Sequence, residues 1–140
     1  MATRSAIGIQ QEDGSVIGIY CHWDGYVDHN GRILNDHYDR DKTMALMDLG
    51  DLSVLGKELG KKQDFDSPTD RNWCLAYGRD RGERDINSVA YHDPNEFYKE
   101  FKNAGVDYWY LLEGDTWLVR GYDEDHWQRV DILLGEEVAA

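Results

Sequence analysis

Two tight-turn signals flanked by β-rich runs constrain the fold of this 140-residue chain more than any other feature. The first is Asp13-Gly14, between the runs 4–11 and 15–22. An Asp-Gly pair is a strong hairpin signal, because a type I′ turn needs positive φ at both central residues. Apolar residues fall on both faces of these runs, so we expect central strands that are covered on two sides.

The register of this first hairpin assigns side chains to faces. A two-residue turn pairs Ile7 with Tyr20. Because side chains alternate along a strand, His22 then shares the face of Ile7 and Tyr20, and Cys21 lies on the opposite face. The thiol and the imidazole of these neighbours are therefore expected to point apart.

The second turn signal is Gly114-Asp115, between the runs 107–112 and 116–122. It is a type II′ candidate, and it pairs Leu112 with Trp117 and Tyr110 with Val119. A further alternating strand pattern occupies residues 72–77, and a weaker one occupies residues 86–91. The aromatic rows Trp73/Tyr77 and Tyr108/Tyr110/Trp117 are expected to belong to the core more than to a ligand site.

Helix signals lie between the hairpins. Asp93, Pro94 and Glu96 form a helix start, with an N-cap carboxylate, proline at the first position and a glutamate two residues later. This helix should stop at Gly105 and bury Phe97, Phe101 and Ala104. Residues 32–38 and 41–49 are further helix candidates. Residues 23–30 and 63–71 are expected to be loops, and 51–62 a turn with a short helical or irregular segment.

These elements predict an α+β fold in a single domain, residues 1–140. We expect an antiparallel sheet built from the two β-hairpins plus one or two further strands, with two or three helices packed on it. The chain is long enough to bury a core without disulfide staples. Cys21 and Cys74 are expected to be buried free thiols.

The charge is the strongest signal in the composition. Fifteen Lys and Arg against 28 Asp and Glu give a net charge of −13. Such a field repels phosphate backbones, so direct nucleic-acid binding is disfavoured. Three explanations of the acidity stay open: a solvated surface, a surface that docks on a basic partner or mimics nucleic acid, and adaptation to a saline habitat. No apolar run is long enough to span a membrane and the first residues lack a signal-peptide core, which predicts a cytoplasmic protein.

The densest group of functional side chains is Cys21-His22-Trp23-Asp24-Gly25-Tyr26, directly after a strand-like run. Loops that leave a rigid sheet commonly carry binding groups. A metal site could draw on His22 and Asp24 together with His29 and His37, but no pair has a ligand spacing that supports it, and we predict no metal and no cofactor. A Cys21 nucleophile is disfavoured by its expected burial.

Recognition is the better hypothesis for these residues. Trp23 and Tyr26, together with the predicted turn Arg79-Asp80-Arg81, combine an aromatic platform with an arginine fork. This combination suits a planar anionic ligand or an acidic patch on a protein. The alternative is that the aromatic side chains cover the core and the arginines neutralise neighbouring acids. The candidate binding residues are His22, Trp23, Asp24, Tyr26, Arg79 and Arg81.

Several strings resemble a family of small accessory proteins encoded by tailed bacteriophages. They are the opening Thr3-Arg4-Ser5-Ala6-Ile7-Gly8, the Cys-His-Trp-Asp-Gly-Tyr motif, residues 49–56, residues 76–83 and the Tyr-Leu-Leu-Glu-Gly-Asp-Thr-Trp hairpin. The resemblance covers most of the chain. It implies origin more than activity, and no catalytic residue is carried over from it.

This resemblance implies a protein that acts in the host cytoplasm. The leading hypothesis is a non-enzymatic binding protein that inhibits a host or defence protein or sequesters a signalling nucleotide. The alternative is a small phage hydrolase acting on a nucleotide. The expected partners are therefore a host protein or a small nucleotide, without a membrane. A homodimer is also expected, through a sheet edge at residues 116–122.

Overall fold

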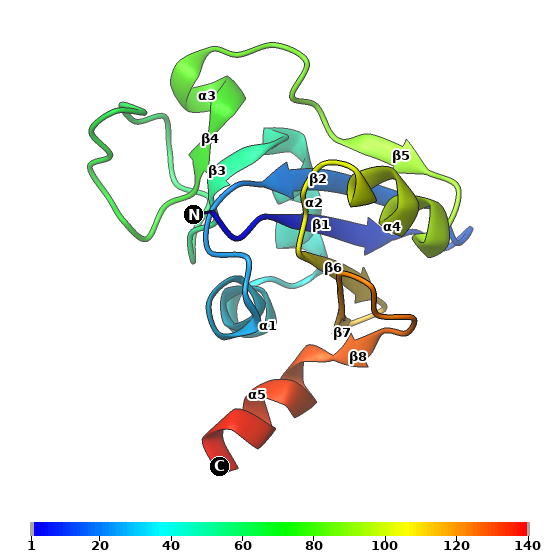
Figure 1. Ribbon diagram of the computed structural model, residues 1–140. Helices are drawn as coiled ribbons and strands as arrows, with labels where there is room; N and C mark the ends of the chain where they lie inside the picture. The colour runs from blue at the N-terminus through cyan, green and yellow to red at the C-terminus, as the bar shows by residue number, and fades with distance from the viewer. Residues whose placement is uncertain (1, 140) are drawn as a thin grey trace.

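The computed structural model describes residues 2–139, with side chains described as far as Gly135. Within these residues the chain forms an α+β fold around one mixed sheet of eight strands, in the order β4-β3-β2-β1-β6-β7-β8, with β5 paired to β2 (Figure 1). The strands are β1 Ser5–Gln10, β2 Val16–Cys21, β3 Leu52–Val54, β4 Leu75–Ala76, β5 Val89–Tyr91, β6 Tyr108–Glu113, β7 Thr116–Gly121 and β8 Gln128–Arg129.

Helices cover both faces of this sheet. The described helical elements are a π-helical turn η1 Val27–Gly31, then α1 Arg32–His37, α2 Arg40–Leu49, α3 Tyr77–Arg81, α4 Pro94–Lys102 and α5 Val130–Ala139. Side chains from α1, α2 and α5 share one buried cluster, and side chains from α4 belong to another. Figure 1 shows α4 in front of β1 and β2, with α2 behind them.

The α+β class is confirmed, but the expectation of a purely antiparallel sheet is wrong. β1 runs parallel to β6, and β2 runs parallel to β3. The segment between β2 and β3 contains η1, α1 and α2, which carry the chain back across one face so that β3 enters in the direction of β2. The sequence did not predict β3, because its three residues lie in a segment that was not expected to form a strand.

The first hairpin forms with a register one residue away from the expected one. The Gln11 N–H donates to the Ser15 carbonyl at 2.7 Å, and the Gly14 N–H donates to the Gln11 carbonyl at 3.0 Å. Gly14, at φ 89°, therefore ends a three-residue loop and not a two-residue turn. Ile7 pairs with Ile19 instead of Tyr20.

The shifted register keeps the predicted separation of Cys21 and His22, but the expectation that Ile7 shares the face of His22 is wrong, because Ile7 lies on the face of Cys21. Cys21 is fully buried in the cluster that contains Ile7 and Ile19. His22 Nδ1 instead lies 2.8 Å from the hydroxyl of Tyr20, which packs against the other cluster. The side chains of Cys21 and His22 thus lie on opposite faces of the sheet.

The second hairpin and the helix start agree with the sequence. Leu112 pairs with Trp117 and Tyr110 with Val119, and the hairpin turns at Gly114 with φ 58°. The Asp93 carboxylate caps α4 by accepting from the Glu96 N–H at 2.8 Å. Ala104 is exposed, contrary to expectation, because α4 ends at Lys102 and the next buried side chain is that of Val106.

A glycine pair explains how closely α4 approaches the sheet. Gly8 and Gly18 are direct partners in the first hairpin. A Cβ atom on Gly18 would lie 2.6 Å from the ring of Phe97, and one on Gly8 would lie 3.0 Å from the same ring. The absence of both side chains lets the fully buried Phe97 ring rest directly on the strands.

Candidate functional site

The Cys-His-Trp-Asp-Gly-Tyr segment leaves the sheet where the parallel strands β2 and β3 run side by side. The N–H groups of His22 and Trp23 each donate, at 3.0 Å, to carbonyls of Leu52 and Ser53. The chain then turns at Asp24, which has φ 59°. Asparagine and aspartate tolerate this left-handed region better than most residues, so the sequence suits the turn.

Further contacts fix the backbone of this loop. The Gly25 N–H donates to the Thr3 carbonyl at 2.8 Å, and the Gly25 carbonyl accepts from the buried Tyr110 hydroxyl at 2.6 Å. A Cβ atom on Gly25 would lie 2.9 Å from Ser5 Cβ and from the Thr3 carbonyl oxygen. Only glycine fits here without moving the N-terminal segment. The loop is therefore held in place before it meets any ligand.

Asn30, which is fully buried, connects the loop to the helical turn that follows. Its Nδ2 atom donates to the Trp23 carbonyl at 3.2 Å and to Ser5 Oγ at 3.3 Å. Its Oδ1 atom lies 3.0 Å from His29 Nδ1. Since Oδ1 can only accept, this network assigns the imidazole proton to Nδ1. The other ring nitrogen, Nε2, lies 3.9 Å from Asp24 Oδ2.

A pocket of about 380 Å³ opens between this loop and the segment that precedes β4. Its volume is in the range of small-molecule sites. Asp24 and His29 line one side, and Asp70 and Arg71 come from the second segment. The remaining lining side chains are mainly apolar: Val54, Gln63, Pro68, Trp73 and Leu75.

The second segment has little regular structure, and two buried polar side chains hold it. Gln63 Nε2 donates to the Cys74 carbonyl at 3.2 Å, while Gln63 Oε1 accepts from the N–H groups of Thr69 and Asp70. The Asp80 carboxylate accepts from the N–H groups of Gln63 and Ala76 at 2.9 and 2.8 Å. These bonds replace the strand ladder that the segment lacks.

Of the candidate residues from the sequence, those in the first loop lie close to one another. Trp23 and Tyr26 are 43% and 41% exposed, which is high for such large side chains. The Trp23 ring meets the His22 ring edge-on at 4.8 Å between centroids. The Tyr26 ring lies 5.9 Å from that of His29, which lines the pocket with Asp24.

The two arginines have different environments. Arg79 donates to the carbonyls of Leu59 and Cys74, both at 2.7 Å, and its Nε is 3.0 Å from an oxygen of the fully buried Asp80 side chain. Its guanidinium is therefore engaged inside the fold. Arg81 is exposed, and its guanidinium lies over the rings of Phe65 and Tyr77 at 4.3 and 5.0 Å. Both arginines belong to α3, where a turn was expected.

Sequence reasoning missed the second side of the pocket. Trp73 was expected in the core, yet it is partly exposed and lines the pocket. Asp70 and Arg71 lie in a segment expected only to be a loop. The one available signal was the clustering of Asp, Arg and Trp within residues 70–73, which shares its aspartate and tryptophan with the first loop.

Burial determines the chemistry of the neighbouring side chains. It raises the pKa of Cys21 to about 12, so this thiol stays protonated at neutral pH. Burial also lowers the pKa of His22, with a smaller contribution from the positive charge of Arg4. Among the described residues, no group of three His, Cys, Asp or Glu side chains could hold a metal ion.

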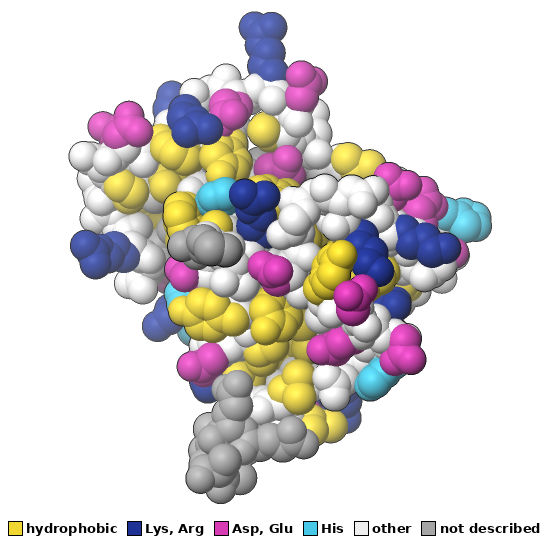
Figure 2. All heavy atoms as spheres, in the orientation of Figure 1, with side chains coloured by type: hydrophobic (Ala, Val, Ile, Leu, Met, Phe, Trp, Pro, Cys, Tyr) yellow, Lys and Arg dark blue, Asp and Glu magenta, His cyan; other side chains and the backbone are white. Residues whose placement is uncertain are grey.

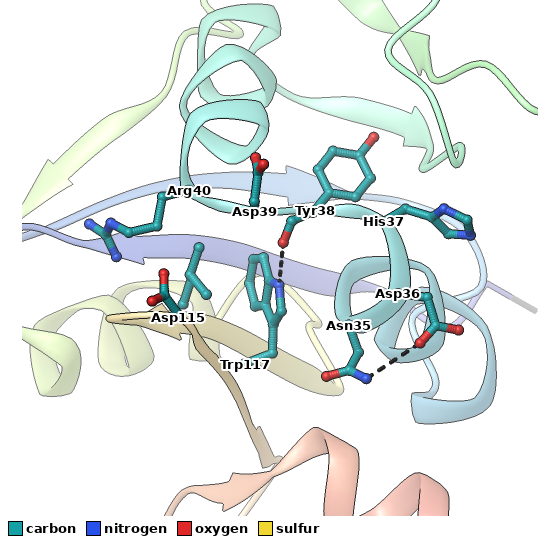
Figure 3. A pocket seen from close by; sticks show the side chains of 9 residues that line it. Asn35, Asp36, His37, Tyr38, Asp39, Arg40, Asp115 and Trp117 are labelled. Carbon is teal, nitrogen blue, oxygen red and sulfur yellow. Dashed lines mark hydrogen bonds between the residues drawn. The ribbon is translucent and has the colours of Figure 1, made fainter.

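A second hollow, of about 430 Å³, lies between the α1–α2 junction and β7 (Figure 3). Its polar groups are largely engaged in the fold. The Trp117 indole N–H donates to the Tyr38 carbonyl at 3.0 Å, and Arg40 donates to the carbonyls of Gly114 and Gln10. Figure 3 shows His37 pointing away from Trp117. The polar groups of this hollow bond the helices to the ends of the two hairpins. We therefore place the candidate site at the pocket lined by Asp24 and Arg71.

Comparisons with family models, with curated proteins and with solved structures found no match. Among the described residues, no helix combines the length and the apolar content needed to cross a membrane. The candidate site is therefore interpreted from its own geometry and charge.

Proposed function

We propose that this chain is a non-enzymatic binding protein of bacteriophage origin that docks on a host or defence protein in the host cytoplasm. The observation that supports this most is the exposure of Trp23 and Tyr26 on a backbone that is already fixed. Large aromatic side chains are common anchors of protein interfaces. A preformed loop loses little conformational entropy on binding, so more of the contact energy appears as affinity.

The net charge of −13 supports a basic partner. Complementary charge raises association rates and disfavours acidic competitors. On the face shown in Figure 2, the acidic side chains are scattered among hydrophobic and basic ones and form no continuous row. This distribution supports general electrostatic attraction to a basic protein more than close mimicry of a nucleic-acid backbone.

One observation favours the alternative of a small hydrolase acting on a nucleotide. His29 Nε2 lies 3.9 Å from Asp24 Oδ2 at the edge of the pocket, and an imidazole beside a carboxylate can accept a proton from water. None of the nine lining residues is Ser, Thr or Cys, so the pocket holds no covalent nucleophile of these types. Turnover of a nucleotide by the purified protein would favour this second function.

Affinity capture from bacterial lysate, followed by binding measurements with the purified partner, tests the main proposal. We expect one stoichiometric basic host protein. Trp23→Ala should weaken its binding by roughly thirtyfold, the effect of losing about 2 kcal/mol at a central anchor. Tyr26→Ala should weaken it as well. Met44→Ala is the matched control, because Met44 is exposed on α2, away from the loop. Equal affinities for the wild type and the Trp23 and Tyr26 variants would refute the proposal.

A further inference from the structure

Two charged groups of the pocket lack hydrogen-bond partners among the described residues. The Asp24 carboxylate has only the imidazole of His29 nearby, at 3.9 Å, which is beyond hydrogen-bonding distance. The Arg71 guanidinium, which lines the same pocket, makes no hydrogen bond or ion pair with the described part of the chain. In contrast, Arg79 has its donors engaged in the fold. The pocket thus offers the Asp24 carboxylate as an acceptor and the Arg71 guanidinium as a cationic donor.

The two groups belong to different segments, and apolar side chains line the space between those segments. Asp24 follows β2, whereas Arg71 lies in the segment before β4. Trp73, Val54 and Leu75 line the pocket with them. Gly60 lies against the Trp73 indole so closely that a Cβ atom there would be 2.2 Å from Trp73 Cγ. The indole is thereby held from one side, as a stacking platform requires.

This arrangement suits a flat ligand with hydrogen-bond donors at one end and an anion at the other. A carboxylate has only acceptors, so it pairs best with two adjacent N–H groups. Guanine presents two such groups, N1–H and N2–H, along one edge. Adenine presents a donor beside the bare acceptor N1, which would face a carboxylate oxygen. Because the Asp24 carboxylate can only accept hydrogen bonds, it favours guanine over adenine.

The neighbouring groups complete the match to a nucleotide. Asp70 Oδ1 accepts from the Asn72 N–H at 2.9 Å, and no hydrogen bond to its second oxygen is recorded among the described residues. Carboxylates are common partners of ribose hydroxyls. Arg71, the next residue, can reach a phosphate with its planar fork. A net charge of −13 opposes every additional phosphate, so a single phosphate is favoured.

We propose that the pocket between the Asp24 loop and residues 70–73 binds a guanine ribonucleotide that carries one phosphate, with Asp24 on the guanine edge, Trp73 stacked on the base and Arg71 on the phosphate. This site goes beyond the docking of the aromatic loop on a protein and does not depend on it. Binding here needs the purified chain alone.

Calorimetric titration of the purified protein with guanosine monophosphate, adenosine monophosphate and guanosine tests the proposal. We expect the guanine nucleotide to bind at least about tenfold more tightly than the adenine nucleotide, the usual discrimination of a two-bond contact. Inosine monophosphate, which lacks the N2 amine, should bind with intermediate affinity. Absence of saturable binding, or equal affinity for the two bases, would overturn the proposal.

Three variants assign the roles. Asp24→Asn should abolish the preference for guanine and keep the fold, since asparagine tolerates the φ of 59° at this position. Arg71→Gln should weaken binding of guanosine monophosphate but leave that of guanosine unchanged. Arg84→Gln is the matched control, because this exposed arginine lies outside the pocket lining. A guanine preference that survives in Asp24→Asn, or equal losses for guanosine and its monophosphate in Arg71→Gln, would contradict the assignment. Neither result bears on capture of a host protein by Trp23 and Tyr26.

Discussion

At the scale of single residues, Asn30 determines the shape of the candidate site. A fully buried amide that lost its partners would carry a large desolvation penalty, so such a group strongly favours the one geometry that satisfies it. Here that geometry fixes the Trp23 carbonyl, the Ser5 hydroxyl and the His29 ring at once. One short polar side chain thereby orients both the loop and the imidazole that borders the pocket.

Trp23 should contribute to binding far more than to folding. Because its side chain is nearly half exposed, we expect Trp23→Ala to lower the free energy of unfolding by less than about 1 kcal/mol. Trp117→Ala, at a residue that is 3% exposed, should cost roughly 3–5 kcal/mol. Urea unfolding of both variants measures the difference. Comparable losses would mean that Trp23 covers the core.

The two thiols should be unreactive in the folded protein. Cys21 and Cys74 are both buried and free, and burial raises the pKa of each. Since only the thiolate reacts readily, we expect an aromatic disulfide reagent to modify neither cysteine under native conditions and both in denaturant. Rapid labelling of one thiol per chain in the native protein would contradict this.

At the scale of elements, α3 anchors the segment that forms one side of the pocket. The side chains of Arg79 and Asp80 are 17% and 0% exposed and bond to three separate stretches of backbone. We expect Arg79→Ala to destabilise the fold by about 3 kcal/mol or more, because it leaves a buried carboxylate and two carbonyls without partners. Arg81→Ala should change stability by less than about 1 kcal/mol. Similar losses of unfolding free energy in the two variants would contradict this division of roles.

The same pair predicts a dependence of stability on pH. Burial acts to raise the pKa of Asp80, but hydrogen bonds from Arg79 and from the N–H groups of Ala76 and Gln63 outweigh it and lower the pKa. The ionised carboxylate therefore stabilises the fold above its ordinary value of about 3.9, and this contribution is lost as the pH falls through the lowered pKa. The stability gap between the wild type and Asp80→Asn should be constant near neutrality and shrink in acid. Chemical unfolding at several pH values measures this difference in stability. A difference that stays constant in acid would contradict the lowered pKa of Asp80.

At the scale of the whole molecule, charge and sheet edges decide association. β8 pairs with β7 at only two positions, Leu118 and Val119, so the rest of that strand edge has no strand partner among the described residues. We predict a homodimer through this edge. Two chains of charge −13 repel each other, so the dimer fraction should rise when salt shortens the screening length. Light scattering at micromolar concentration and two salt concentrations tests this, and a monomer at both would reject it.

Local patterns in the sequence predicted the elements whose causes are local. Asp93 and Glu96 define the start of α4, and the Gly114-Asp115 turn sets the register of Leu112 with Trp117. In each case the interacting groups lie within a few residues of one another, so the residue types are sufficient to predict the element. The exposed loop after β2 could be predicted for the same reason, since polar and aromatic residues directly follow an apolar strand.

Long-range contacts decided the remainder. The direction of β3, the internal role of Arg79 and the meeting of Asp24 with Arg71 all depend on segments that are far apart in the chain. Even the one-residue shift at Gly14 reflects the sheet as a whole, because it pairs Ile7 with Ile19 and buries both on one face. The sequence by itself determined the α+β class, the N-cap of α4 and the place of the exposed loop after β2. Only the tertiary structure decided which side chains are free to bind, because that depends on which buried carbonyls and carboxylates each charged group must satisfy first.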